Sequence, residues 1–394
     1  AVDEVHDLIT KYKIDCHYSN HGILYTSWTD PQQGRIQSNQ DASEKLGYTT
    51  KIISKDQMRQ WIGGASPNLS GGWYEKSNSG NFNPYLLARG LLEKTVLPLG
   101  VEFYENSPVS NLEWVNDKLI TCEVNGHKVE ATNVVVCTNS YTHEGNGGKG
   151  LKMYKDTFVP VHVYQVVTEV LPPEARESLQ WNPKGEDGKN KFPPAFYTLH
   201  RILYGVRLTH DGRIAMGTGL PHYYFNNEMH VQDNQKIYKL LEDKIYEFFP
   251  TLNETPLKID YRWEGIIAAT LDDMPKMGRD ENKKNLYYSF CYNGHGNSIA
   301  NYAGKIVADL YDDYDGAVEK YDGVPFVAVP AKPPIWLAVP PEPLRYAAVN
   351  TLIWQKSVAD RFEEKFNVNG DLPFMGAAAF GVMTALLRLI RRMR

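Results

Sequence analysis

The stretch "YYSFCYNGHGNSIANYAGKIVADL", from Tyr287 to Leu310, decides the fold class. It opens with an aromatic and apolar run typical of a buried strand. From about residue 297 onward its apolar residues recur at helical spacing. The joint between them, "NGHGN" at 293–297, places two glycines around a histidine. One glycine or asparagine would suffice as a helix cap, so two glycines indicate either a ligand close to the backbone or a tightly packed turn.

The expected helix after residue 297 has backbone N–H groups without partners in its first turn. Those groups and the helix dipole favour an anion or an electron-rich ring oxygen beside them. His295 is a candidate for proton transfer at this place. A histidine held as a cap by its neighbours is the simpler interpretation.

The composition is that of an ordinary globular protein of 394 residues, with 42% hydrophobic and 23% charged residues and a formal net charge of −5. This length fits two domains, or one large domain with a discontinuous partner. The sequence has no basic stripe with interleaved aromatic residues, which argues against nucleic acid as a partner. It has no HExxH motif, and no metal site is expected. The cysteines are far apart and indicate reduced thiols in a protein that is not secreted: Cys16, Cys122, Cys137 and Cys291.

Periodicity along the chain predicts both helices and strands. The clearest helix covers about 84–97, with proline in its first turn and leucines at core-facing spacing. A shorter helix at 54–62 begins with Ser54 as its cap. Strand patterns dominate 156–220, and the proline-rich stretch 323–344 is expected to be an extended connector with few core contacts. Further helices are expected at 1–15, 231–250, 297–311 and 345–365.

A second glycine-rich stretch, "GNGGKG" at 145–150, imitates the G-x-G-x-x-G fingerprint of dinucleotide-binding proteins. The fingerprint must open a helix within a strand–helix–strand unit. Here only about ten residues separate the glycines from the next strand pattern, and Pro160 interrupts them. That is too few residues for such a helix. We interpret 145–150 as a loop.

Another informative stretch is "WEGIIAATLDDMPKMG" at 263–278, where a strand pattern leads into a Thr-x-Asp-x-x-Pro-x-x-Gly turn. Asp272 can bond to its own backbone, Pro275 stiffens the turn, and Gly278 permits close approach. Taken alone, this stretch is an ordinary turn.

Taken together and in this order, the motifs resemble the D-amino-acid oxidase superfamily of FAD-dependent oxidoreductases. The most similar branch contains glycine/sarcosine oxidases and gamma-glutamylputrescine oxidoreductases. The resemblance covers roughly residues 1–315. It is carried by the 263–278 turn, the Gly-His-Gly helix start, "SPVSNLE" at 107–113, "VVVCTNSYT" at 134–142 and the hairpin "YGVRLTHDGRIAMG" at 204–217.

The resemblance implies FAD as cofactor, with backbone groups of the Gly-His-Gly turn facing the flavin ring. It implies that Val109 contacts adenine and that the turn after 134–136 passes the cofactor. The implied cofactor-binding residues are Val109, Thr138, Asn139, Gly278, Asn293, Gly294, His295, Gly296 and Asn297. Catalytic residues are not identified.

Three parts of the family pattern have no match in this sequence. The N-terminal strand–GxGxxG–helix–strand unit, which holds the ADP half of FAD in the family, is not found in residues 1–80. We therefore expect roughly 70–100 residues of the pattern to be missing before Ala1, which is not a methionine. The arginine that clamps a substrate carboxylate in amino-acid-oxidising relatives would lie near 267–268, where the sequence has Ile-Ala. No cysteine occurs at 265–270 for a covalent flavin link.

The expected fold is α/β: an incomplete FAD-binding domain of the glutathione-reductase type (Rossmann) interleaved with a mostly antiparallel substrate domain. The expected segments are 1–81 (substrate domain and entry helices), 82–145 (FAD domain), 146–260 (substrate domain), 261–315 (FAD domain), 316–344 (proline-rich connector) and 345–394 (helical tail).

The tail ends in a stretch from Phe374 to Leu387 without charged residues, followed by four arginines. This is shorter than the ~20 residues needed to span a bilayer. A basic end next to small residues suits contact with a membrane surface or another subunit. A helix that closes the protein core is the alternative.

Two functions follow from these observations. The first is a degenerate, non-catalytic accessory subunit of a larger, membrane-bound complex, with other protein subunits as partners. The alternative is an active FAD-dependent oxidoreductase of amine C–N bonds, whose ADP-binding unit comes from another chain or from an N-terminal segment. Missing the carboxylate-clamping arginine, the active enzyme would oxidise an amine rather than a free amino acid. The expected location is intracellular and membrane-associated, with an organelle such as the mitochondrion as one candidate.

Overall fold

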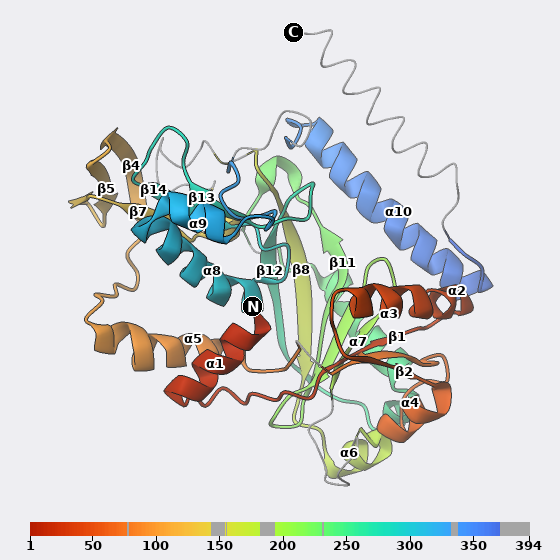
Figure 1. Ribbon diagram of the computed structural model, residues 1–394. Helices are drawn as coiled ribbons and strands as arrows, with labels where there is room; N and C mark the ends of the chain where they lie inside the picture. Colours follow the sequence, from red (N-terminus) through yellow and green to blue (C-terminus); the bar gives the residue numbers. More distant parts are fainter. Residues whose placement is uncertain are drawn as a thin grey trace.

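An eight-stranded, mostly antiparallel sheet forms the centre of the computed structural model, which describes residues 1–76, 79–142, 154, 156–181, 194–230, 232–331 and 338–370 (Figure 1). Its strands come from widely separated parts of the chain, and only β1 and β9 pair in parallel. In spatial order they are β12 (Ile259–Ala269), β8 (Val159–Thr168), β11 (Ile214–His222), β10 (Tyr204–Leu208), β9 (Ala195–Thr198), β1 (Ile23–Thr26), β3 (Gly72–Glu75) and β2 (Thr50–Ile53).

A second sheet contains the strand of the opening stretch. β14 (Leu286–Phe290) pairs in parallel with β7 (Val134–Val136) and antiparallel with β13 (Lys276–Arg279). All five residues of β14 are buried, as the aromatic and apolar run predicts. Within the described part of the chain, β7 forms one edge of this sheet.

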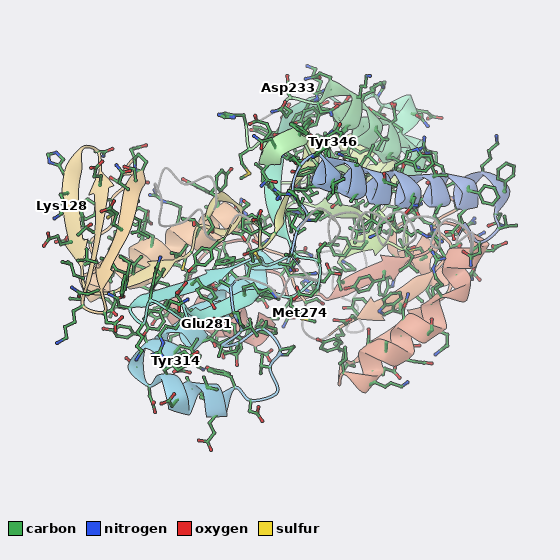
Figure 2. All side chains as sticks on the ribbon, turned by 90° about the horizontal axis from the view of Figure 1, so that it is seen from above. Lys128, Asp233, Met274, Glu281, Tyr314 and Tyr346 are labelled. Atoms are coloured by element: carbon green, nitrogen blue, oxygen red, sulfur yellow. The ribbon has the colours of Figure 1, made fainter. Side chains whose placement is uncertain are left out.

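A third, antiparallel sheet projects from the side of the molecule and consists of β4 (Val109–Asn116), β5 (Leu119–Val124) and β6 (His127–Ala131). Figure 2 shows Lys128 at its outer end, far from Tyr346 on the last helix. The expected α/β fold, with an antiparallel sheet interleaved with a second sheet and followed by a C-terminal helix, is confirmed. β12 lies in the large sheet, so the expected domain boundary at 261 falls inside this strand.

The helices cover the sheets and largely agree with the periodicity. Ser54 caps α4 through a reciprocal capping box with Gln57. The helix expected at 84–97 is α-helical only to Leu91 and continues as a π-turn and a 3₁₀ turn. The helices are α1 (Val2–Tyr12), α2 (Asp30–Gly34), α3 (Ile36–Lys45), α4 (Lys55–Trp61), α5 (Pro84–Leu91), α6 (Pro173–Leu179), α7 (Gln235–Phe248), α8 (Gly296–Asp312), α9 (Tyr314–Lys320) and α10 (Leu344–Phe366).

The proline-rich connector packs against the core, so the expectation of few core contacts is wrong. Val327 is buried in one apolar cluster with Met277 and Tyr287, and it forms a parallel bridge to Met277. The Ala331 carbonyl accepts a hydrogen bond from Thr157. Proline removes N–H donors, but it leaves carbonyl groups and apolar side chains that can still be buried.

Helix α10 is held to the large sheet by buried charges. Glu363, whose side chain is fully buried, accepts hydrogen bonds from Arg201 (2.8 Å) and Arg35 (3.1 Å). Asp360 accepts from the backbone N–H groups of Arg201 and Ile202, both at 2.9 Å. Next to this cluster, Glu364 accepts hydrogen bonds from His200 (3.0 Å) and Lys244 (2.8 Å).

In the described residues, none of the helices is long and apolar enough to cross a membrane. The tail from Phe374 to Leu387 and the loop at 145–150 lie outside the described residues. Their expected roles stay predictions.

We expect Glu363→Gln to lower the free energy of unfolding by about 2 kcal/mol at pH 7, because two arginines lose their buried counter-charge. Burial alone raises the pKa of Glu363, but hydrogen bonds from Arg201, Arg35 and the Gly370 amide outweigh it and lower the pKa to about 2. The folded-state pKa lies below the unfolded value, so this stabilisation is present above pH 4.5 and is lost as pH falls towards 2.

Urea unfolding of both proteins between pH 7 and pH 2.5 measures this difference. Asp243→Asn is the control, because it breaks the exposed Lys239–Asp243 pair and should change stability by no more than about 0.5 kcal/mol. If both variants lose the same free energy of unfolding at pH 7, the network around α10 contributes no more stability than a surface ion pair.

Candidate functional site

The start of α8 presents an exposed, glycine-containing turn. Asn293 and Gly294 both have positive φ angles, of 49° and 87°. His295 is the N-cap residue, and its side chain makes no capping hydrogen bond. Gly294, His295 and Asn297 are exposed, and Gly296 is half-buried. The N–H groups of the first turn therefore remain available to a bound group with negative charge.

The Asn293 side chain joins this turn to the turn after β12. Its Oδ1 accepts a hydrogen bond from the Thr270 backbone N–H at 2.8 Å, and its Nδ2 donates to the Cys291 carbonyl at 2.8 Å. The two sequence motifs, which lie apart in the chain, are thus bonded to each other. Thr270 is 7% exposed, so its N–H depends on Asn293 as acceptor.

The turn after β12 is fixed by its own charges. Asp272 and Lys276 form an ion pair at 2.6 Å, and Asp272 also accepts from the Met274 N–H. Burial raises the pKa of Asp272, but the hydrogen bonds from Lys276 and Met274 outweigh it and hold the pKa below its usual value. The carboxylate therefore stays ionised as part of the turn.

A third loop, after β7, meets the same place. Asn139 has a positive φ of 45°, and its Oδ1 accepts a hydrogen bond from the Cys291 backbone N–H at 3.0 Å. The neighbouring Thr138 is exposed, and its hydroxyl lies 2.9 Å from that of Thr142. The structure thus brings Thr138 and Asn139 next to the turn at 293–297.

Two predicted cofactor residues lie elsewhere. Val109 begins β4, in the separate third sheet, and is 42% exposed. Gly278 is buried in β13, where a Cβ atom would lie 2.8 Å from the Tyr288 hydroxyl. Close packing of Tyr288 accounts for glycine at this position.

A cavity of about 670 Å³ lies between the start of α8 and the large sheet. His295 contributes to its lining, together with residues of β1, β3, β9 and α3. The lining is rich in aromatic side chains: Tyr25, Tyr48, Trp73 and Tyr197. The cavity therefore reaches the same helix N-terminus that the sequence motifs single out.

The aromatic wall is built by strand register. Tyr25 lies directly opposite Trp73 on β3 and opposite Tyr197 on β9. The Tyr25 and Trp73 rings stack at 4.4 Å with 13° between their planes. Tyr197 lies beside Gly205 of β10, where a Cβ atom would come within 2.6 Å of its ring. Glycine at 205 thus makes room for the ring at the edge of the cavity.

The alternate residues of the same strands fill the core on the other side of the sheet. Leu24 and Phe196 belong to the largest buried cluster, and Tyr74 packs against it. Tyr164 is also a member of that cluster and Tyr204 packs against it, whereas Tyr197 lines the cavity.

Glu75, Trp73 and Tyr25 are functional candidates that the sequence motifs did not reveal. Their signal is alternation within short strands, which shows that two faces differ but not which face borders a cavity. Among the described residues, no group of His, Cys, Asp or Glu is arranged to hold a metal ion.

Comparison with known proteins agrees with these features. A family model described as FAD dependent oxidoreductase matches residues 1–310. Gamma-glutamylputrescine oxidoreductase from Escherichia coli (strain K12) is 27% identical over 320 residues, covering 81% of this chain and 67% of that protein.

Solved structures share the fold at low sequence identity. Glycine oxidase from Geobacillus kaustophilus has a TM-score of 0.65 at 15% identity, covering 82% of this chain and 79% of that one. L-alpha-glycerophosphate oxidase from Mycoplasma pneumoniae, solved with FAD bound, has a TM-score of 0.60 at 14% identity, covering 79% and 78%.

We expect Asn293→Ala to lower the free energy of unfolding by about 2 kcal/mol, because the buried Thr270 N–H loses its acceptor and alanine tolerates positive φ poorly. The matched control is Asn301→Ala on α8, since that side chain only bonds the Asn297 carbonyl of its own helix at 2.9 Å. The control should change stability by at most roughly 0.5 kcal/mol. Chemical denaturation measures the free energy of unfolding of both variants. If Asn301→Ala loses as much stability as Asn293→Ala, the bridging role of Asn293 is refuted.

Proposed function

Because the chain belongs to the family of FAD-dependent oxidoreductases, we propose that it oxidises the C–N bond of an amine, with the flavin bound beside the start of α8. The observation that carries the proposal is the cavity lined at one end by His295 and on another side by the aromatic face of the large sheet. A substrate in this cavity would lie next to the helix N-terminus where the flavin is expected.

The residues present fit the flavin part of FAD. The first turn of α8 offers N–H groups that no side chain caps, and the positive end of the helix dipole stabilises negative charge beside it. Asn139 and Asn293 hold the adjoining loops in place through the backbone of Cys291. A site fixed in this way needs little rearrangement when charge develops.

FAD supplies a hydride acceptor when it is bound. With FAD bound, the amine would give up a hydride from its α-carbon while its nitrogen lone pair forms the second C–N bond of an iminium ion. The protein's contribution is to orient the amine and to exclude water from the cavity. Burial, together with the nearby negative charge of Glu75, raises the pKa of Tyr25, so its hydroxyl stays protonated as a hydrogen-bond donor.

The ADP part of FAD requires a further unit in this proposal. β7 forms the edge of its sheet within the described residues, and an additional parallel strand can pair there. We propose that a strand–GxGxxG–helix unit, from a segment preceding Ala1 or from another chain, occupies this edge.

The same edge favours a second candidate function, a non-catalytic accessory subunit of a larger complex. In that case another protein would pair with β7, and no flavin would be bound. The two candidates differ in the flavin content of the native protein, which decides between them.

The test is purification from the native source, heat release of any flavin, and amine-dependent reduction of a dye. We expect one flavin per chain and dye reduction with amines rather than with α-amino acids. A native protein free of flavin would overturn the enzyme proposal and support the accessory subunit.

We further expect Gly296→Leu to reduce the flavin content at least tenfold, because a side chain at the helix start would occupy the space beside the first-turn N–H groups. Gly304→Leu is the matched control on the same helix, since a Cβ atom there meets nothing within 4 Å. Absorbance of the flavin bands per chain measures the effect. Unchanged flavin in Gly296→Leu would place the cofactor elsewhere.

A further inference from the structure

One carboxylate in the cavity has no partner among the residues that the structure describes. Glu75 is 7% exposed and lines the cavity. In the described part of the chain, no hydrogen bond or ion pair involves its carboxylate; only its backbone carbonyl accepts a bond, from Ser79. Burial raises the pKa of Glu75, and no neighbouring group opposes this. A buried carboxylate without a partner is costly, so its position calls for a counter-charge that the described residues do not supply.

The walls around Glu75 suit a cation. Tyr25 and Trp73 stack against each other, and the Tyr25 and Tyr197 ring centroids are 6.1 Å apart. Glu75 follows Trp73 by two residues on β3, so both side chains lie on the same face of the sheet. The faces of aromatic rings attract ammonium groups, most strongly where water is excluded.

The lining has no lysine or arginine that could bind an anionic ligand in the same way. Glu75 is the one carboxylate among the lining residues, and lysine and arginine do not occur among them. His200 is already bonded to Thr198 and to Glu364. Arg207 lies on the same sheet face but outside the lining, and its guanidinium donates to the Phe82 carbonyl at 2.9 Å.

We propose that this cavity binds an organic ammonium ion, with Glu75 as its counter-charge and Tyr25, Trp73 and Tyr197 as its aromatic walls. This inference rests on the proposed function and names the substrate class. The substrate is an amine that carries a second nitrogen, and this second nitrogen is cationic. The C–N bond of one nitrogen is oxidised beside the start of α8, and the other nitrogen is held as an ammonium group at Glu75. Such a molecule is a diamine or an amine with a distal ammonium group.

The experiment is calorimetric titration of the purified full-length protein with three four-carbon probes of similar size: 1,4-diaminobutane, 1,4-butanediol and succinate. We expect the diamine to bind and the neutral diol and the dianion to bind at least tenfold more weakly. Diol or succinate binding as tight as that of the diamine would overturn the proposal, whatever the variants do.

The variant is Glu75→Gln, which keeps the shape of the side chain and removes its charge. We expect it to bind the diamine at least tenfold more weakly than the unmodified protein. Glu130→Gln is the matched control, because Glu130 is a strand glutamate on β6 in the third sheet, where it forms an exposed pair with Lys128. The control should bind the diamine normally.

Thermal melting without ligand separates a binding role from a structural one. Because Glu75 has no partner within the described protein, Glu75→Gln should leave the melting temperature unchanged or raise it. A lower melting temperature together with unchanged diamine binding would show that Glu75 is structural.

Failure of this inference is distinguishable from failure of the proposed function. A protein that contains flavin but binds the three probes alike disproves the cation site and leaves the enzyme proposal standing. A flavin-free protein that binds the diamine through Glu75 has the cation site but is no oxidoreductase.

Discussion

The alternation of side chains along a strand is the constraint on which the rest of this structure depends. In β1, β3 and β9, one set of residues must be apolar to build the core, and the intervening set faces the other way. Leu24 and Phe196 fill the core, whereas Tyr25, Trp73 and Tyr197 line the cavity. A one-residue slip in register would exchange the two sets. The same pairing that stabilises the sheet therefore also positions the aromatic wall.

The sequence predicted the parts whose signals are local. The strand, glycine turn and helix from 287 to 310 are encoded in consecutive residues, as is the cap of α4 at Ser54. Glu75 could not be found in this way, because its isolation depends on strands that are far apart in the chain. The packing of the proline-rich connector was also missed, since proline content predicts an extended backbone but not which surface that backbone covers. The roles expected for the cofactor residues stay predictions, although Asn139 and Asn293 meet at Cys291.

The lining of the cavity contains groups of both electrostatic signs. The first turn of α8 contributes partial positive charge through the N–H groups after His295, and Glu75 contributes negative charge on the sheet side. A ligand with an electron-rich group at one end and a cation at the other would bind in a single orientation. Orientation of this kind would reduce the number of unproductive binding modes of such a ligand.

The contacts of α10 have a consequence for the order in which parts of the protein fold during synthesis. Arg35 and Glu363 are separated by 328 residues, and His200, in the cavity lining, is held by Glu364, 164 residues later. Such long loops close late during folding, because their entropic cost precedes any gain from the contact. During synthesis, His200 lacks this partner until residue 364 has left the ribosome. A nascent chain that has already formed most of the large sheet would still have an unfinished cavity lining, because His200 has not yet met Glu364.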